Sequence, residues 1–317
     1  MTRRTLAWLA LNHLPGAGAV TLRRLASRFG SPEGALEATL EQLAAIGSLS
    51  ITQARELRRL AADVQRFERL ADSLTQSGGR LLTLDDDEYP ANLQPLRDAP
   101  PLLYLRGSIR SRDEAAVAIV GTRTPSEAGE AVAQSVAEAL AARGVTVVSG
   151  LARGIDAAAH RGALAAGRTI AVLGSGIDRV TPRAHRSLAE KVAASGALMS
   201  EVPPGTGANR ETLLARNRIQ AGLAKAVIVA QCRSRGGSFA TARRALATGR
   251  QVLALLWDEP EYAEGTQRLA MMGARAVSGA EAIEIAANTA FAPPPRAPQA
   301  EMAFDSSHSE ARSASEG

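Results

Sequence analysis

The chain has 317 residues, a formal net charge of +5 and 45% hydrophobic residues, which is typical of a folded protein rather than a disordered or fibrous one. This length can bury one large core and a smaller one, and no apolar run is long enough to cross a membrane. The single cysteine, Cys232, excludes an internal disulfide and fits a reducing compartment, so the expected location is cytoplasmic.

Arginine dominates the basic residues. All 37 of them except Lys191 and Lys225 are arginine, and the isoelectric point is about 10.1. A GC-rich genome would produce the same bias without any function, so the position of each arginine must decide its role.

Residues 1–75 are predicted to form a small all-helical domain of the SAM or helix-hairpin-helix kind, because leucines recur at helical spacing. The turn 14–18, Leu-Pro-Gly-Ala-Gly, could turn its glycine amides toward a nucleic-acid phosphate, with Arg23 and Arg24 close behind. A simple packing unit of two helices explains the same pattern, so DNA contact by this domain stays open.

Residues 76–114 are predicted to form an extended connector packed on the next domain, because short apolar runs alternate with prolines. One or two strands are expected in it. The acidic run 85–88 could suggest a metal site, but consecutive acids point in alternating directions, so a solvated turn is favoured.

Residues 115–287 are predicted to form an α/β domain with a Rossmann-like, doubly wound, mostly parallel sheet. The expected strands are 117–120, 145–149, 169–173, 197–201, 226–230 and 251–256, with a last strand near 274–277. Residues 288–317 have too little apolar content to fold alone, and we expect a disordered tail.

Arginines and glycines gather at the ends of these strands, where open α/β sheets bind ligands. The turn at Gly121, Thr122 and Arg123 lacks the further glycines of a dinucleotide fingerprint, and the chain has no P-loop pattern. The sequence therefore predicts no nicotinamide cofactor and no ATP hydrolysis.

Catalytic groups are sparse. Asp156 and His160 lie four residues apart on one helix, but two ligands make a weak metal site, and a helix-capping Asp156 with a supporting His160 is favoured. Glu201 follows a strand and could serve chemistry, although an acid paired with a neighbouring arginine is the stronger interpretation. Cys232 is expected to pack. We predict no catalytic residue and no bound metal.

A basic groove along one sheet edge is the favoured alternative. Eight arginines lie in or just after strand-end loops: Arg123, Arg153, Arg179, Arg183, Arg216, Arg218, Arg233 and Arg235. Such a groove suits a polymer of phosphates, whose affinity should fall with salt by about 0.7 in log–log slope per contact on a single strand. Aromatic residues make up only 3% of the chain, and Phe239 is the best candidate for stacking on a base.

Six motifs in this order resemble the DNA-processing protein A (DprA, also called Smf) family: VAIVGTR, VVSGLARGIDAAAH, TIAVLGSGIDRVTP, LMSEVPPG, RNRIQAGLAKAVIV and GGSFATARRAL. The resemblance covers about residues 5–260. It implies a homodimer that binds single-stranded DNA and loads the RecA recombinase onto it in natural transformation. Single-strand-binding protein would be a further partner. No cofactor and no enzymatic activity are expected.

The resemblance assigns phosphate or DNA contacts to four elements. They comprise Gly121, Thr122 and Arg123; Ser149, Gly150, Arg153, Gly154 and Asp156; Arg216, Asn217 and Arg218; and Gly236, Gly237, Ser238 and Thr241. Gly174 and Gly176 complete the candidates, together with Phe239. The family usually has Phe-Pro before the RNR element, where this chain has Leu213-Leu214, and only the tail stands where many members have a winged-helix domain.

The main rival is an enzyme, a phosphoribohydrolase of the lysine-decarboxylase-like family, whose signature PGGxGTxxE carries a glutamate beside the scissile bond. Gly236-Gly237 is present here, but Arg243 stands in the register of that glutamate. An arginine cannot supply the acid. A nucleotide-sensing module without catalysis is a further alternative.

Overall fold

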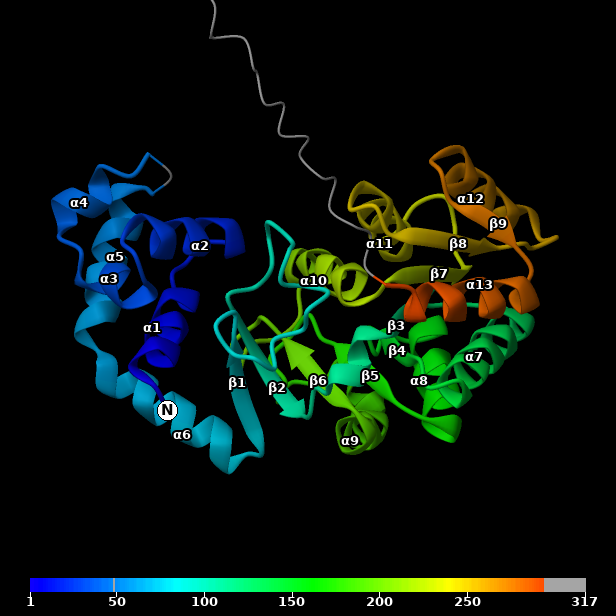
Figure 1. Ribbon diagram of the computed structural model, residues 1–317, viewed down its shortest axis with the longest axis horizontal. Coiled ribbons are helices and arrows are strands. Elements are labelled where there is room, and N and C mark those ends of the chain that lie inside the picture. The colour runs from blue at the N-terminus through cyan, green and yellow to red at the C-terminus, as the bar shows by residue number, and fades with distance from the viewer. Residues whose placement is uncertain (48, 294–317) are drawn as a thin grey trace, which may run out of the picture.

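The computed structural model describes residues 1–47 and 49–293. Helices α1 to α6 gather at one end of the molecule, and a sheet with helices on both faces forms the rest (Figure 1). The expected tail lies mostly outside the described residues, but α13 extends the folded part to Phe291 instead of ending near 287. In the described part of the chain, no helix is long and apolar enough to span a membrane.

Four of the six N-terminal helices begin at hydroxyl caps, and the six enclose a core of their own. Thr2, Ser31, Thr39 and Ser50 each accept a hydrogen bond from a backbone amide in the first turn of a helix, as such residues do at N-caps. Trp8, Leu25, Leu57 and Phe67 are among the buried side chains of this core, which also takes in Tyr104 from the sheet. The helices are α1 (Arg3–Asn12), α2 (Ala19–Arg28), α3 (Pro32–Glu37), α4 (Leu40–Ala44), α5 (Ile51–Ala62) and α6 (Val64–Gln76).

One sheet of nine strands runs through the rest of the described chain, in the order β1-β2-β6-β5-β4-β3-β7-β8-β9. From β6 to β9 all neighbours are parallel, as the sequence predicts, and each predicted strand is present within about two residues. The strands are β1 (Gly79–Thr83), β2 (Leu102–Gly107), β3 (Ala116–Gly121), β4 (Thr146–Ser149), β5 (Thr169–Val172), β6 (Ala197–Ser200), β7 (Ala226–Gln231), β8 (Gln251–Leu255) and β9 (Arg275–Val277).

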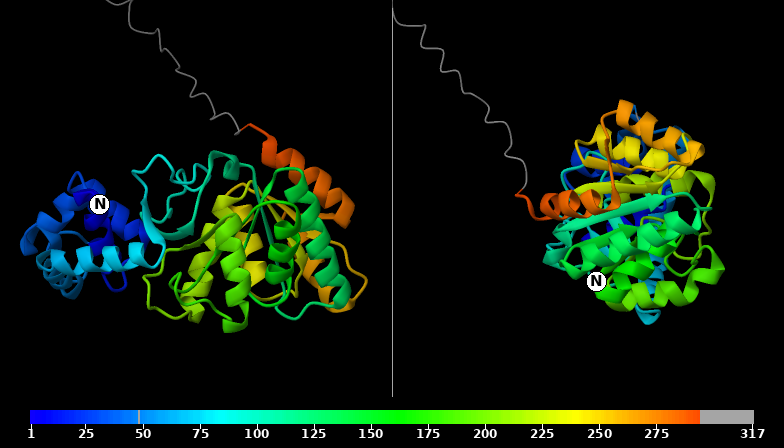
Figure 2. Two further views of the ribbon diagram at one scale, coloured as in Figure 1. Left: turned by 90° about the horizontal axis from the view of Figure 1, so that it is seen from below. Right: turned by 90° about the vertical axis from the view of Figure 1, so that its right-hand side faces the viewer.

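Helices cover both faces of the sheet (Figure 2). Ala118 and Val120 face the core under α10, α11 and α12, while Val117 and Ile119 face α7, α8 and α13. Because both faces are covered, the strands are continuous apolar runs. The elements are η1 (Ser111–Glu114), α7 (Glu127–Ala142), α8 (Ile155–Ala166), η2 (Arg183–His185), α9 (Arg186–Ser195), α10 (Arg210–Leu223), α11 (Gly237–Ala247), α12 (Pro260–Met271) and α13 (Gly279–Phe291).

The connector contributes two strands that extend the sheet at one edge. Strands β1 and β2 pair antiparallel with each other, and β2 pairs antiparallel with β6. In the acidic run, Asp85 accepts bonds from Arg4 and Trp8, and Asp86 accepts from Thr83 N over 2.6 Å. These carboxylates hold a turn and a neighbouring helix, as a structural rather than metal-binding run would.

A buried ion pair links η1, which precedes β3, to the residue just before β5. Arg168 and Asp113 are 5% and 8% exposed, and the guanidinium donates Nε to Oδ1 over 2.6 Å and Nη2 to Oδ2 over 2.8 Å. Arg168 also donates to Ser195 O and Ser108 O, while Thr146 Oγ1 donates to Asp113 Oδ1. Every charged group of this pair therefore has a partner away from water.

His160 is fully buried and should make folding sensitive to acid. Thr169 Oγ1 donates to Val147 O, so it accepts from His160 Nδ1 over 2.7 Å, and Nε2 is left as a buried acceptor without a partner. Desolvation, then the charges of Arg216 and His185, lower the pKa of His160 to about 3.

Protonation of His160 should oppose folding between about pH 6.5 and pH 3. The unfolded chain takes up this proton below about pH 6.5 and the folded chain does not, so the free energy of unfolding falls as pH falls through that window. At pH 5 we expect a loss of about 2 kcal/mol relative to pH 7.5 from this group. Urea unfolding at both pH values checks it, with His160→Asn as the variant that should lose this part of the pH dependence; equal pH dependence in both proteins would contradict it.

Candidate nucleic-acid interface

The sheet has a topological switch point beside β3. The chain moves from β3 through β4 and β5 to β6, and then returns to place β7 on the other side of β3. Ligands of open α/β sheets bind at such points, beyond the carboxyl ends of the strands. A pocket of about 810 Å³ lies there, between the turns that follow β3 and β7 and the helices α10 and α11. We call it the basic pocket.

The basic pocket brings together residues from three of the four predicted elements and one residue of the other. The predicted residues that line it are Gly121, Thr122, Arg123, Asp156, Arg216, Asn217, Gly236, Gly237, Ser238 and Thr241.

The turn after β3 forms one wall. A Cβ on Gly121 would lie 2.4 Å from Ile155 Cγ1, so only glycine fits where the strand meets α8. Thr122 N donates to Gln231 O over 2.7 Å, which ties this turn to the end of β7. The backbone contact holds Arg123 at the rim, where its side chain is exposed.

The N-terminus of α11 forms the opposite wall. Its N-cap is Gly236, at φ 139°, which has no side chain to bond the first amides of the helix. A Cβ on Gly236 or Gly237 would meet nothing within 4 Å, so the space before the helix is open. Uncapped amides and the positive end of the helix dipole attract an anion at such a place.

Arg216 of α10 lies at the floor. It is 5% exposed, and its Nη1 is 3.9 Å from Asp156 Oδ2. Nε and Nη1 are buried without a hydrogen-bond partner. Asp156 lies in the first turn of α8 but accepts from Gly150 N over 3.1 Å, so it holds the preceding loop and Arg216 rather than capping the helix as expected. Burial lowers the pKa of Arg216, and Asp156 opposes this shift.

Gly150 is required by the position of Arg216. A Cβ on residue 150 would lie 1.5 Å from Arg216 Nη1, so Gly150→Ala should expel the guanidinium from the floor. We expect a loss of about 1–3 kcal/mol of unfolding free energy, measured by urea denaturation. Gly207→Ala, where a Cβ meets nothing within 4 Å, is the matched control and should change little. Unchanged stability of Gly150→Ala would show that the floor is not packed in this way.

Four exposed arginines surround the pocket: Arg123, Arg210, Arg233 and Arg235. Arg233 also contacts Glu261 over 3.0 Å at the surface. Arg210 is not among the DNA contacts that the sequence predicts. A signal was available, because Asn209 and Thr212 form the capping box that begins α10 and so place Arg210 at a strand-to-helix loop.

Other predicted residues support the pocket without lining it. Ser149 Oγ donates to Ile119 O in the interior, and Gly154 is the N-cap of α8 at φ 74°. A Cβ on Gly174 would press on Leu213, and one on Gly176 would reach Asp178 and Pro203, so these two glycines permit close packing. Arg153 is exposed but does not line the pocket.

Phe239 is not the stacking platform that the sequence suggested. Its side chain is buried in the core under α11, and the guanidinium carbon of Arg268 lies 5.8 Å from the ring centroid. Aliphatic residues line the pocket instead, with Leu213 and Leu214 in the place of the expected Phe-Pro. Leu214 is 48% exposed and offers an apolar surface to a ligand.

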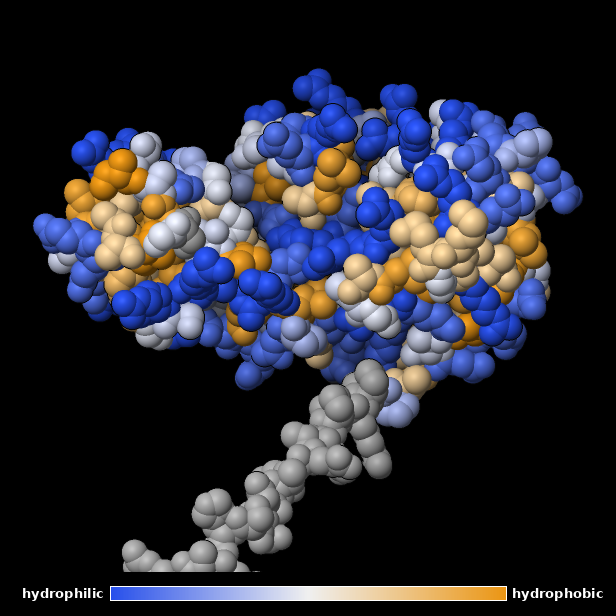
Figure 3. Space-filling view, turned by 90° about the horizontal axis from the view of Figure 1, so that it is seen from above, coloured by the Kyte–Doolittle hydropathy of each residue, from blue (hydrophilic) through white to orange (hydrophobic). Residues whose placement is uncertain are grey.

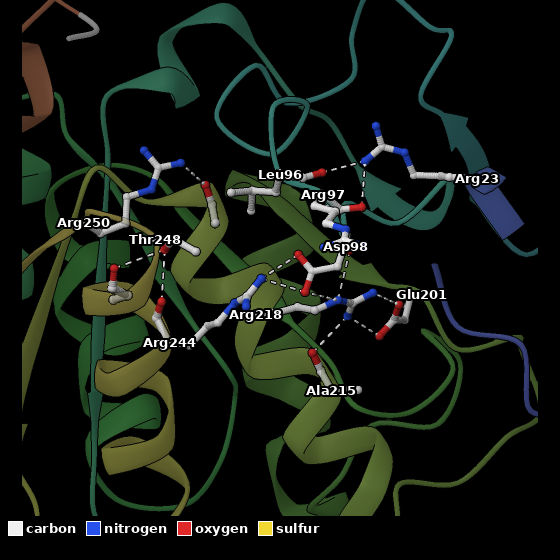
Figure 4. A network of polar contacts seen from close by, with 12 residues as sticks. Arg23, Leu96, Arg97, Asp98, Glu201, Ala215, Arg218, Arg244, Thr248 and Arg250 are labelled. Carbon is white, nitrogen blue, oxygen red and sulfur yellow. Dashed lines mark hydrogen bonds and ion pairs between the residues drawn. The ribbon is translucent and has the colours of Figure 1, made fainter. Parts of the chain in front are cut away.

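Arg218 does not line the basic pocket, although it is two residues from Arg216. It donates Nη1 and Nη2 to the carboxylate of Glu201 over 2.6 and 2.5 Å, and Nε to Asp98 O over 3.1 Å (Figure 4). The Asp98 carboxylate accepts from Arg244 Nη2 over 2.6 Å. Glu201 is thus paired with an arginine, as the favoured interpretation held, and Asp98 joins α10 to α11.

Asp98 belongs to a segment, residues 92–98, that we call the strap. Arg23 of α2 donates to Leu96 O over 2.5 Å and to Arg97 O over 3.2 Å, and Arg250 donates to Asn92 O over 2.8 Å. The strap therefore links the N-terminal helices to both helices of the pocket. On the face in Figure 3, a hydrophilic hollow lies between the N-terminal helices and the rest of the molecule. Arg23, which follows the turn 14–18 in the sequence, therefore holds the strap in place.

Among residues 1–47 and 49–293, no cluster of three His, Cys, Asp or Glu side chains could hold a metal ion. Cys232 is buried, and burial raises the pKa of its thiol to about 12, as suits a packing residue.

Comparisons with known proteins agree with one another. The model of the family described as DNA recombination-mediator protein A matches residues 80–288. Protein Smf of Synechocystis sp. is 38% identical over 253 residues, which cover 78% of this chain and 63% of that protein. DNA processing protein DprA of Bacillus subtilis is 34% identical over 223 residues, 69% of this chain and 74% of that protein.

Two solved structures share the fold. DNA processing protein A from Streptococcus pneumoniae has a TM-score of 0.74 at 30% identity, covering 90% of this chain and 98% of that one. DNA processing protein A from Helicobacter pylori, whose structure is described for a single-stranded DNA binding mode, has a TM-score of 0.58 at 28% identity, covering 65% of this chain and 94% of that one.

Proposed function

This chain belongs to the DNA recombination-mediator protein A family, and we propose on that premise that it binds single-stranded DNA in the basic pocket. The observation that carries the proposal is the combination of four exposed arginines with an uncapped helix N-terminus at the switch point of the sheet. The Helicobacter pylori relative is described as binding single-stranded DNA, the same ligand that we propose for this pocket.

The phosphates of the strand would follow the rim of the pocket. Arg123, Arg210, Arg233 and Arg235 would pair with successive phosphates, and the amides at the start of α11 would hold one of them. Arg218 is excluded from this set, because Glu201 and Asp98 already neutralise it. Arg153 and the N-terminal turn are proposed only as outer contacts.

Fluorescence anisotropy with labelled oligonucleotides tests the proposal. Single strands should bind more tightly than duplexes of the same length, with a log–log salt slope of about 0.7 per phosphate contact. Equal affinity for both forms, or affinity that is insensitive to salt, would contradict it.

We further propose that the bound strand is handed to RecA recombinase by a homodimer, in the DNA uptake and recombination that the family serves. The family description as a recombination mediator supports this role. Strand exchange on DNA precoated with single-strand-binding protein is the measurement. RecA-dependent product should appear sooner when the protein is added, and no acceleration would refute the loading role.

A nucleotide-cleaving enzyme is the alternative, and the pocket does not favour it. Of the described residues, Asp156 is the one acidic side chain that lines the pocket, and Arg216 and Gly150 N already engage it. Arg243 is exposed and does not line the pocket. Incubation with AMP should release no adenine at a protein-dependent rate.

A further inference from the structure

The strap contacts both helices of the basic pocket from outside it. Among the residues that the structure describes, none of the strap residues 92–98 lines the pocket, which α10 and α11 help to form. The Asp98 carboxylate instead accepts from Arg244 Nη2 of α11 over 2.6 Å, and the Asp98 carbonyl accepts from Arg218 Nε of α10 over 3.1 Å (Figure 4). One residue of the strap therefore fixes the two helices relative to each other.

The strap also fits closely against α10 near the C-terminal end of that helix. A Cβ on Gly222 would lie 2.5 Å from Leu96 Cδ1 and 2.6 Å from Leu93 Cδ2, so these leucines pack directly on the helix backbone. Asn92 Nδ2 donates to Leu223 O, the last carbonyl of α10, over 2.8 Å. A displacement of the strap would therefore disturb α10 as well, because closely packed elements transmit strain to one another.

Arg23 of the N-terminal helices holds the strap from the other side. This half-buried residue of α2 donates Nη1 to Leu96 O over 2.5 Å and to Arg97 O over 3.2 Å. Hydrogen bonds from a charged donor are about twice as strong as those between neutral groups. Without Arg23, two carbonyls of the strap would lose their donor, and the strap would be held less firmly on α10.

We infer that Arg23 is a positioning residue for the basic pocket: through the strap it sets the spacing of α10 and α11. The floor residue Arg216 belongs to α10, and the uncapped amides of the opposite wall begin at Gly237 of α11. A ligand that lies between these walls binds more tightly when their spacing is fixed beforehand, since ordering them on binding costs free energy. The inference rests on the proposed function, because single-stranded DNA is the ligand whose affinity would change.

Hydrogen exchange of the full chain without DNA is the first test. Arg23→Ala should speed the exchange of backbone amides in α10 and α11, because the strap would hold these helices less firmly. Arg28→Ala removes the same charge from an exposed position in the last turn of α2 and should leave these amides unchanged. If Arg23 served local packing alone, exchange would change only in α2 and the strap, and that result would overturn the inference.

Affinity for single-stranded DNA is the second test. In anisotropy titrations, Arg23→Ala should bind a labelled oligonucleotide about fivefold more weakly than the wild-type chain. The log–log salt slope should stay the same, because no phosphate contact is lost, and Arg28→Ala should bind like the wild type. Equal affinities of the two variants would overturn the inference and leave strand binding by the rim intact.

Gly222→Ala is the second variant, for use if Arg23→Ala does not fold. Its Cβ would push the same leucines of the strap from the side of α10, so faster exchange in α11 upholds the inference and unchanged exchange there overturns it. If the wild-type chain binds no single strand, the proposed function fails and exchange alone decides. The inference then stands if amides of α10 and α11 exchange faster in Arg23→Ala but not in Arg28→Ala, and it falls if they do not.

Discussion

Reversing the charge of Arg123 and Arg235 together, as Arg123→Glu with Arg235→Glu, is expected to lower the affinity for single-stranded DNA by about 100-fold. Both side chains are exposed at the rim of the basic pocket, on opposite walls. Each would lose a charge-assisted contact with a phosphate and gain a repulsion, while neither is part of the buried core. The log–log salt slope should also shrink by about 0.7 for each lost contact. Anisotropy titrations at several salt concentrations measure both quantities.

The control changes the same net charge elsewhere. Arg112 in η1 and Lys191 in α9 are exposed and do not line the pocket, so Arg112→Glu with Lys191→Glu should weaken binding far less. If the two double variants lost affinity equally, only the overall charge of the protein would matter, and the pocket would not be the site.

Removing Asp113 is expected to cost the most stability. In Asp113→Ala the Arg168 guanidinium would remain buried at 5% exposure without its carboxylate. A buried ion pair broken on one side typically destabilises a protein by about 3–5 kcal/mol, because the remaining charge is neither hydrated nor paired. The free energy of unfolding from urea titration at pH 7.5 is the measurement.

Two further variants test whether the unpaired, buried charge of Arg168 causes this loss of stability. Glu284→Ala breaks the surface pair with Arg143, whose partners are 42% and 65% exposed, and should cost less than about 1 kcal/mol. Asp113→Leu combined with Arg168→Met removes both charges and should recover part of the loss. A cost below about 1 kcal/mol for Asp113→Ala alone would show that the pair is not needed.

The strands were predictable from the sequence because parallel strands covered on both faces must be apolar throughout. Val117 to Val120 form such a run, and all four side chains are buried. The turn at Gly121 was predictable because a glycine directly follows this apolar run, and the structure adds the physical reason, since only glycine fits against Ile155. What the pattern could not indicate is that β1 and β2 extend the sheet, because short runs broken by prolines are compatible with an edge or a loop.

The roles of individual arginines could not be predicted from their place in a motif. Arg216 and Arg218 stand two residues apart, which on a helix turns their side chains about 200° from each other. One therefore enters the floor of the pocket, and the other reaches Glu201 and Asp98. A charge reversal at Arg218 would disrupt that network rather than remove a rim contact. Partners far away in the sequence decide between such roles, and a local pattern does not contain them.

The strap sets the order in which the pocket can form. Its contacts join residues far apart along the chain: Arg244 to Asp98 across 146 positions, and Arg250 to Asn92 across 158. Contacts of such sequence separation close only after most of the chain is available, and they carry a large loop-closure entropy. During synthesis the turn at Arg123 would emerge well before α11, whose N-terminus completes the opposite wall. The basic pocket can thus be completed only once α11 has been made, and a chain that stops short of Arg244 contains the turn at Arg123 without the contact from Arg244 to Asp98 that joins α10 to α11.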